Sequence, residues 1–254
     1  MANAVSRDRR NQYAVFTASL LVGVLLWELL GGRADPIFFV PLTATLARLG
    51  ELVSSGQLAA ALASSGQLFV VGVGTGVIVG APLGILLARI RVLREGAEVY
   101  VTAIYATPMV ALIPFMLAIF GFGFTSKVIV VFLFAVFPML INVFEGARSV
   151  DRRFLEVAAA YRANEWAVWR DVILPYTLPF ALTGFRLAIA RGLVGMIAAE
   201  FFLSVTGLGE LLLVSSRRFD TAGVLAAVLI VSLLGVLLIS VGQRLEDRYA
   251  AWRV

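Results

Sequence analysis

Long apolar runs are the feature that most limits what this chain can fold into. An α-helix needs roughly 20 residues to cross the ~30 Å hydrocarbon core of a bilayer. The chain is 61% hydrophobic and 15% charged, whereas a soluble domain has about 45–50% apolar and about 25% charged residues. We therefore predict an all-α polytopic membrane protein with one transmembrane domain over residues 1–254. Its six predicted spans are about 13–31, 66–88, 99–120, 127–146, 177–203 and 222–243.

The first apolar segment has features of a signal peptide, because it follows three arginines and ends near the small residues "GGRA". Its apolar stretch is longer than a usual signal core and contains Trp27 and Glu28. We interpret it as a retained first helix, with a cleaved signal as the alternative.

Basic residues indicate how the spans are oriented. With the N-terminus inside, most of the 21 lysines and arginines fall on the cytoplasmic side. Both termini and the polar insert 150–176 are then cytoplasmic, in a multi-pass protein; the family resemblance described below implies a prokaryotic inner membrane. The net charge of +5 reflects basic loops at the bilayer surface, so no nucleic-acid partner is expected.

Residue usage argues against a membrane-embedded enzyme. The chain has no cysteine and no histidine, which removes thiolate chemistry and the commonest general base and metal ligand. We expect no catalytic residue, no metal site and no cofactor bound by this chain. Ion-driven secondary transport remains an alternative, although no convincing internal repeat is present.

The polar segment between the first two spans is too polar to cross a bilayer. Leu42, Leu46, Leu49 and Val53 recur at helical spacing. This pattern predicts a helix at the outer interface, and an ordinary packed loop is the alternative.

Glycines recur at every fourth position of the second span. In lipid, small residues at this spacing allow a second helix to approach closely. We predict a tight helix–helix seam, against the alternative of general tolerance for small residues, and the sequence leaves open whether the seam lies within or between subunits. The residues are Gly72, Gly76, Gly80 and Gly84.

Prolines and charges within spans are candidates for a transport path. Pro82, Pro108, Pro114 and Pro138 can each kink a helix. Pro108 and Pro114 make the third span either deformable or statically bent. Arg191 lies mid-span, where it can meet an anionic substrate or neutralise a carboxylate. Glu200 is on the opposite helix face and near the outer end, where we expect water or a loop beside it. The predicted path residues are Arg191, Pro108, Met109, Phe115 and Glu200.

The insert is rich in charge and alanine. Asp151 and Glu156 suit the first turn of a helix, and "EVAAAYRA" has high helix propensity. Pro175 and Pro179 are expected to end this local order before the fifth span. The pattern predicts a short cytoplasmic docking helix.

"EVAAAYRANEWAVWRDVILP" resembles the E-A-A loop of ABC-importer permeases. "LLWELL", "ATPMVALIPFMLAIFGFGFTSK", "FPMLINVFEGARSVD" and "AAEFFLSVTGLGELL" extend the resemblance to the nitrate/sulfonate/taurine permeases over nearly the whole chain. The resemblance implies a type I importer fold and a loop that couples to an ATPase. The coupling residues that it implies are Glu156, Ala158, Ala159, Arg162, Leu174 and Pro175.

Arg162 departs from the family pattern, because glycine is usual six residues after the glutamate. An arginine here predicts a continued helix or a different turn after the docking helix.

The energy source must lie outside the chain. A phosphate-binding loop requires GxxxxGK[ST], and the one lysine, Lys127, follows Ser126 instead. ATP and Mg²⁺ are thus expected on a separate cytoplasmic subunit.

The resemblance also implies a second permease copy and an external substrate-binding protein that docks near Arg217, Arg218 and Asp220. It implies a small anionic solute such as a sulfonate, taurine or nitrate, or an aromatic acid, and leaves its identity open.

Overall fold

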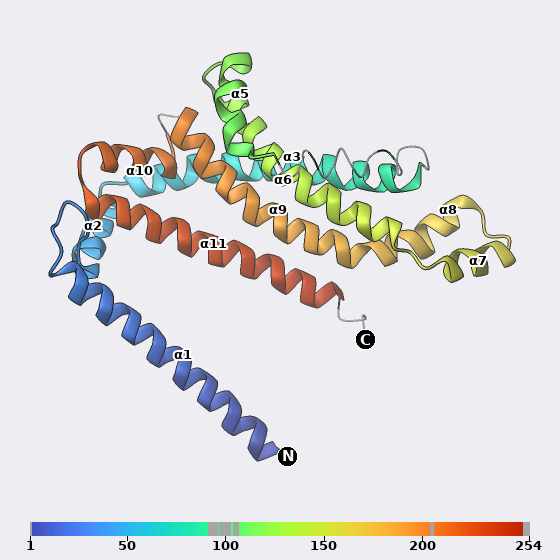
Figure 1. The fold of residues 1–254 in the computed structure, drawn as a ribbon, viewed down its shortest axis with the longest axis horizontal. Helices are drawn as coiled ribbons and strands as arrows, with labels where there is room; N and C mark the ends of the chain where they lie inside the picture. Colours follow the sequence, from blue (N-terminus) through green and yellow to red (C-terminus); the bar gives the residue numbers. More distant parts are fainter. Residues whose placement is uncertain (1, 91–95, 97–102, 104–106, 204–205, 251–254) are drawn as a thin grey trace. The chain divides into compact units, whose positions relative to one another are not determined.

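The computed structural model describes residues 2–90, 96, 103, 107–203 and 206–250 (Figure 1). These residues form helices and turns, without a strand in the described ranges. The chain divides into two compact units. The first unit is Met1–Ala59 with Leu211–Ile230, and the second is Ala60–Glu210 with Val231–Val254.

The predicted all-α class is confirmed. Apart from two short non-α turns, every element in the described ranges is an α-helix. The elements are α1 (Ala2–Gly31), α2 (Leu42–Ser54), α3 (Gln57–Arg89), a 3₁₀ turn (Met109–Leu112), α5 (Ile113–Phe120), α6 (Phe124–Arg148), α7 (Arg152–Ala160), α8 (Glu165–Val168), a π turn (Trp169–Ile173), α9 (Leu174–Leu203), α10 (Leu208–Arg217) and α11 (Thr221–Ala250).

Within the described ranges, five helices are long and apolar enough to cross a membrane, and they match five of the six predicted spans. They are Ala14–Gly31, Gln57–Arg89, Phe124–Arg148, Glu165–Leu203 and Thr221–Arg248.

The predicted span 99–120 is described only in part, since most of 99–106 lies outside the described residues. Its second half is the shorter apolar helix Met109–Phe120. Pro108 precedes the 3₁₀ turn, and Pro114 lies in the first turn of α5. The first helical turn needs no donor from proline, so these two prolines lie at the starts of helical segments and not in the interior of one described helix. Pro82 and Pro138 do lie inside helices, as predicted.

Polar contacts tie the first unit together. The Glu28 carboxylate accepts hydrogen bonds from the Thr43 backbone N–H (3.1 Å) and hydroxyl (2.7 Å), at the first turn of α2. Arg48 of α2 forms ion pairs with Glu51 (2.6 Å) and with Asp220 (2.8 Å). Hydrogen bonds to Glu51 and Asp220 raise the pKa of Arg48 above its ordinary value. The sequence prediction of a helix over this segment, in preference to a loop, is confirmed by α2.

The glycine row of α3 packs against α6 in the second unit. A Cβ atom at Gly76 would lie 2.8 Å from the Ala135 Cβ, and one at Gly80 would lie 2.7 Å from the Val136 carbonyl oxygen. Such distances are well inside van der Waals contact, so only glycine allows the two backbones to approach this closely. The seam therefore lies within the subunit, which the sequence left open.

Helix α9 also packs against α6, on a face that adjoins the one contacted by α3. A Cβ at Gly195 would lie 2.7 Å from the Phe134 ring, and one at Gly184 would lie 2.9 Å from the Asn142 Cβ. Helix α6 therefore packs against small residues of both α3 and α9 in the second unit. It is the most buried of the five spans.

The expected break at Pro175 and Pro179 is wrong. The helix begins at Glu165 and continues to Leu203, and Pro179 lies inside α9. A π turn over Trp169–Ile173 lies immediately before Pro175. A proline ring clashes with the carbonyl four residues earlier, which here is Asp171. Widening the helix by one residue per turn accommodates that clash without ending the helix.

Candidate functional site

A short helical loop projects from the second unit. Figure 1 shows α7 and α8 at one end of this unit, beyond α6 and α9. The Asp151 side chain accepts a hydrogen bond from the Arg153 N–H (2.9 Å) and so caps α7. Asn164 caps α8 in the same way, through the Ala167 N–H (2.8 Å). Both ends of the connection are therefore fixed by local side-chain hydrogen bonds.

The turn between α7 and α8 corrects the expectation for Arg162. Its backbone is left-handed, with φ of 52°. The Arg162 N–H donates to the Ala159 carbonyl and the Ala163 N–H donates to the Ala158 carbonyl, both at 2.9 Å. This pair of bonds is a Schellman motif, in which the left-handed position usually carries glycine. The sharp turn is kept, and arginine occupies it at a conformational cost.

Large apolar side chains on this loop face outward. Phe154, Val157 and Tyr161 follow one face at spacings of three and four residues, and they are 54%, 55% and 84% exposed. Trp166 of α8 is 70% exposed. A contiguous apolar surface on a charged loop is typical of a protein contact site.

Aromatic contacts connect the loop to the long helices. The Phe154 ring lies 6.5 Å from the Tyr176 ring, which in turn stacks 6.5 Å from the Phe180 ring. The Arg89 guanidinium at the end of α3 lies 5.1 Å from the centre of the Trp169 ring, a cation–π contact. These contacts join the loop and the π turn that follows it to both α9 and α3.

The two ends of the E-A-A motif are separated in the structure. Glu156 is on α7, where it pairs with Arg152 at 3.5 Å, beside the half-buried Ala158 and the exposed Ala159. Leu174 and Pro175 lie at the start of α9, in the wall of a cavity away from the loop surface.

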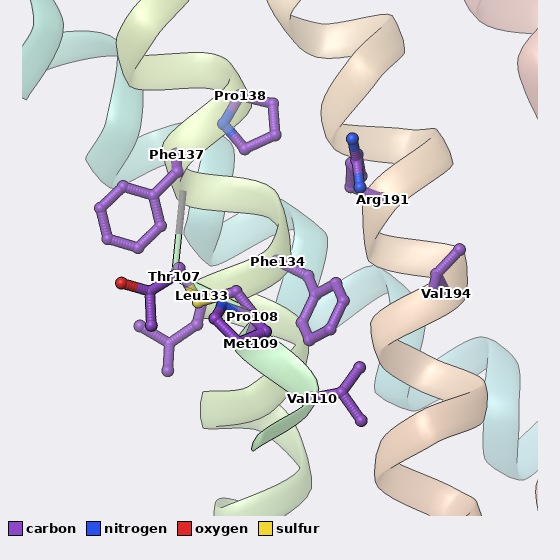
Figure 2. Close-up of a pocket in the computed structure, with 10 residues that line it drawn as sticks. All are labelled: Thr107, Pro108, Met109, Val110, Leu133, Phe134, Phe137, Pro138, Arg191 and Val194. Atoms are coloured by element: carbon purple, nitrogen blue, oxygen red, sulfur yellow. The ribbon is translucent and has the colours of Figure 1, made fainter. Parts of the chain in front are cut away.

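A second candidate site is a cavity of about 350 Å³ around Arg191. Figure 2 shows Arg191 and Val194 on α9, facing side chains from α6 and from the segment before α5. Arg191 is exposed and has no hydrogen bond or ion pair with any described residue. The lining residues are Thr107, Pro108, Met109, Val110, Leu133, Phe134, Phe137, Pro138, Arg191 and Val194.

The structure thus brings together three of the predicted path residues: Arg191, Pro108 and Met109. Phe115 is 58% exposed but does not line this cavity. An arginine within apolar and aromatic walls can bind a small anion that carries an apolar part, since the guanidinium supplies charge and paired donors.

Glu200 forms a separate buried cluster and does not line the cavity. Its exposed fraction is 0%, so the expected exposure to water is wrong, and the hydrogen bonds of its side chain are with residues of α3 and α10 in place of a loop. The carboxylate accepts from the Ser65 hydroxyl (2.7 Å) and the Gly209 N–H (2.9 Å). Ser65 in turn accepts from the Leu208 N–H at 2.9 Å. Glu200 therefore joins α9, α3 and the start of α10.

Sequence reasoning missed the partners of two basic residues, Lys127 of α6 and Arg186 of α9. Lys127 is 8% exposed and donates to Thr206 at 3.4 Å, near Glu200. Arg186 pairs with Glu246 of α11 at 3.1 Å, and Thr183 donates to the same carboxylate at 2.7 Å. The predicted sixth span ended before Glu246, so the pair had no visible partner in the sequence.

Comparison with solved structures identifies the class of fold. The chain matches the MetNI methionine ABC transporter, solved in inward-facing conformations, with a TM-score of 0.67 and 17% identity over 77% of this chain and 97% of the other. An amino acid ABC transporter solved with histidines matches with a TM-score of 0.58. The fold is that of an ABC-importer permease.

Sequence comparison identifies the family. The model of the binding-protein-dependent transport system inner membrane component matches residues 80–251, and the chain belongs to this family. It is 29% identical to the putative aliphatic sulfonates transport permease SsuC of Bacillus subtilis, over 96% of this chain and 90% of that protein. It is 32% identical to the formylaminopyrimidine transport permease ThiX of Halalkalibacterium halodurans, over 70% and 73%. The protein is a multi-pass inner membrane permease subunit of an ABC importer.

Proposed function

We propose that this permease forms the translocation path for a small organic or inorganic anion, with Arg191 as the residue that attracts it. The supporting observation is the exposed, unpaired Arg191 in the α6–α9 cavity. Charge within a span is costly unless it serves a partner or a ligand. The other in-span arginine, Arg186, is already paired with Glu246. Arg191 is therefore the charge on α9 that is available to a solute.

The energy for transport comes from a separate ATPase that binds ATP and Mg²⁺. The exposed apolar face of α7 and α8 is the surface on which this cytoplasmic subunit docks. Family membership favours this ATP-driven mechanism over the ion-driven alternative. Both termini and the α7–α8 loop are cytoplasmic in this proposal, in line with the basic residues at the inner ends of the spans.

Two further partners complete the transporter. A second copy of the chain supplies the other half of the path. A substrate-binding protein docks on the opposite side of the membrane, at the exposed Arg217 and Arg218. Asp220 is not part of that surface, because it is held by Arg48 within the chain.

Uptake by reconstituted transporters tests the role of Arg191. Proteoliposomes would contain the permease, its ATPase and its binding protein, with a radiolabelled alkanesulfonate as the anionic probe and an uncharged pyrimidine as the comparison. We expect Arg191→Gln to lower sulfonate uptake at least tenfold and Arg191→Lys to retain part of it, because lysine keeps the charge and loses the paired donors. Unchanged sulfonate uptake by assembled Arg191→Gln transporters would overturn this role.

Cysteine labelling tests the docking surface and the orientation. The chain has no native cysteine, so a single cysteine at the exposed Ala159 gives an unambiguous signal with a membrane-impermeant thiol reagent. We expect labelling in inside-out vesicles and protection by the bound ATPase. A cysteine at the exposed Gly50 of α2 is the matched control and should label only from the opposite side.

A further inference from the structure

A second cavity of about 350 Å³ lies at the start of α9. It is separate from the cavity around Arg191. Its walls are mainly apolar and come from three helices of the second unit. They include Ala81 and Ile85 of α3, Val143 of α6, and Leu174 and Leu178 of α9.

The polarity of this cavity changes in one direction along the helix. Arg170, in the π turn, lies at one end, Thr177 lies in the middle, and Ala181 lies at the other end. Eleven residues separate Arg170 from Ala181, which is roughly 16 Å at the rise of an α-helix. This length is about half of the ~30 Å hydrocarbon core, so the cavity has the depth of one leaflet.

The middle of the cavity carries a buried hydroxyl without a partner. Thr177 is 3% exposed, and its Oγ1 atom has no hydrogen bond to any part of the chain that is described. This oxygen is covered by protein atoms, so Thr177 belongs to the wall of the cavity and Arg170 is the polar side chain that is open to a ligand.

The charged end of the cavity is available. The Arg170 side chain is 73% exposed, and its Nε atom lies 3.9 Å from the Asp171 carboxylate, which is beyond hydrogen-bond distance. Guanidinium groups bind phosphate through paired, charge-assisted hydrogen bonds. α3 ends in Arg89, which contacts the neighbouring Trp169, so the end of the α3 span lies beside Arg170. We infer that this level is close to the boundary between the bilayer and water, since basic residues collect at the ends of spans.

We propose that this cavity is a binding site for an anionic phospholipid. The phosphate binds Arg170, and an acyl chain lies between Ala81, Leu178 and Ala181. Because the site adjoins the α7–α8 loop, a bound lipid would fix the joint between the loop and α9. Arg191 does not line this cavity, so the lipid site can be tested independently of the proposed transport path.

Lipid retention measured on the full-length chain tests the site. The purified protein would be titrated with phosphatidylglycerol or phosphatidylcholine of identical acyl chains, and bound lipid counted by native mass spectrometry. We expect a preference of about tenfold for phosphatidylglycerol, as one charge-assisted interaction implies. Arg170→Gln should abolish the preference, and Arg170→Lys should keep most of it.

Two matched variants separate this site from general surface binding. Arg153→Gln removes an exposed arginine of α7 outside the cavity and should leave retention unchanged. Ala181→Phe fills the apolar end and should reduce retention of both lipids, and Leu178→Phe serves the same purpose where Ala181→Phe does not fold.

Three outcomes would overturn the proposal. Equal losses from Arg153→Gln and Arg170→Gln would mean non-specific attraction of lipid to a basic surface. Displacement of phosphatidylglycerol by inorganic phosphate, with no effect of the filling variants, would mean a site for free anions. Crosslinking between two copies through a cysteine at Leu178 would mean that a second chain covers the cavity.

Discussion

The α3–α6 seam and the α7–α8 turn place opposite demands on glycine. At Gly80 the backbone conformation is ordinary, but a Cβ atom would collide with the Val136 carbonyl oxygen. At Arg162 the left-handed backbone favours glycine, yet there is room for a side chain that is exposed. A lack of space excludes every side chain, whereas an unfavourable φ costs only about 1–2 kcal/mol. The comparison explains why glycine is kept at the seam and an arginine is tolerated in the turn.

The seam should show the largest effect of substitution. We expect Gly80→Val to lower the free energy of unfolding by about 3 kcal/mol or more, because the fixed backbone of α6 cannot move away from the added methyl groups. The measurement is folded yield and thermal stability in detergent. Gly74→Val is the matched control on the same helix, since a Cβ at Gly74 has no atom within 4 Å. Similar losses from both variants would show that valine disfavours α3 itself and that the seam is not the cause.

Gly207 sharpens the comparison because it combines both demands. Its φ is 107°, and a Cβ there would collide with the Glu200 carboxylate. We expect Gly207→Ala to cost about 2–3 kcal/mol, from backbone strain and crowding together. Gly56→Ala isolates the backbone contribution, since Gly56 has φ of 75° and open space around it; we expect about 1 kcal/mol there.

A double mutant separates the two contributions at Gly207. Glu200→Ala removes the crowded carboxylate, so the Glu200→Ala, Gly207→Ala double mutant should cost less than the sum of the two single changes. Strict additivity in thermal stability would place the whole cost of Gly207→Ala in its backbone conformation.

The same contrast explains which features the sequence could predict. Five spans and the glycine seam were predictable, because apolar length and four-residue spacing are properties of one helix at a time. The continuous helix through Pro175 was not, because a π turn compensates for the proline locally. The burial of Glu200 depends on Ser65 of α3 and Gly209 of α10. Ser65 is far from Glu200 in sequence, and the position of Gly209 depends on the turn before α10.

The candidate sites divide in the same way. The E-A-A segment is contiguous in sequence, so its helix and its exposed face could be predicted from local pattern. The cavity around Arg191 is formed by three separate segments of the chain. The sequence indicated single candidate residues such as Arg191 and Pro108, but not that these segments lie together. Phe115 belongs to the same predicted span as Pro108 and Met109, but it lies on α5 and outside the cavity lining.

The smallest effect, and one of opposite sign, is expected at Arg162. Glycine adopts φ of 52° without the steric cost that arginine has there, so Arg162→Gly should stabilise the turn by about 1 kcal/mol. The Ala163 N–H, which donates to the Ala158 carbonyl, reports this change directly. Its hydrogen exchange should slow roughly fivefold, since 1.36 kcal/mol corresponds to a factor of ten.

Arg153→Gly is the matched control with the opposite expectation. Arg153 lies inside α7, where glycine is less favourable than arginine by somewhat under 1 kcal/mol, so exchange of the α7 amides should accelerate. If Arg162→Gly also accelerated exchange at Ala163, the arginine side chain would have to stabilise the turn by more than its backbone strain costs. The exposed Arg162 side chain makes no hydrogen bond or ion pair with any described residue, so slower exchange is the outcome that the geometry supports.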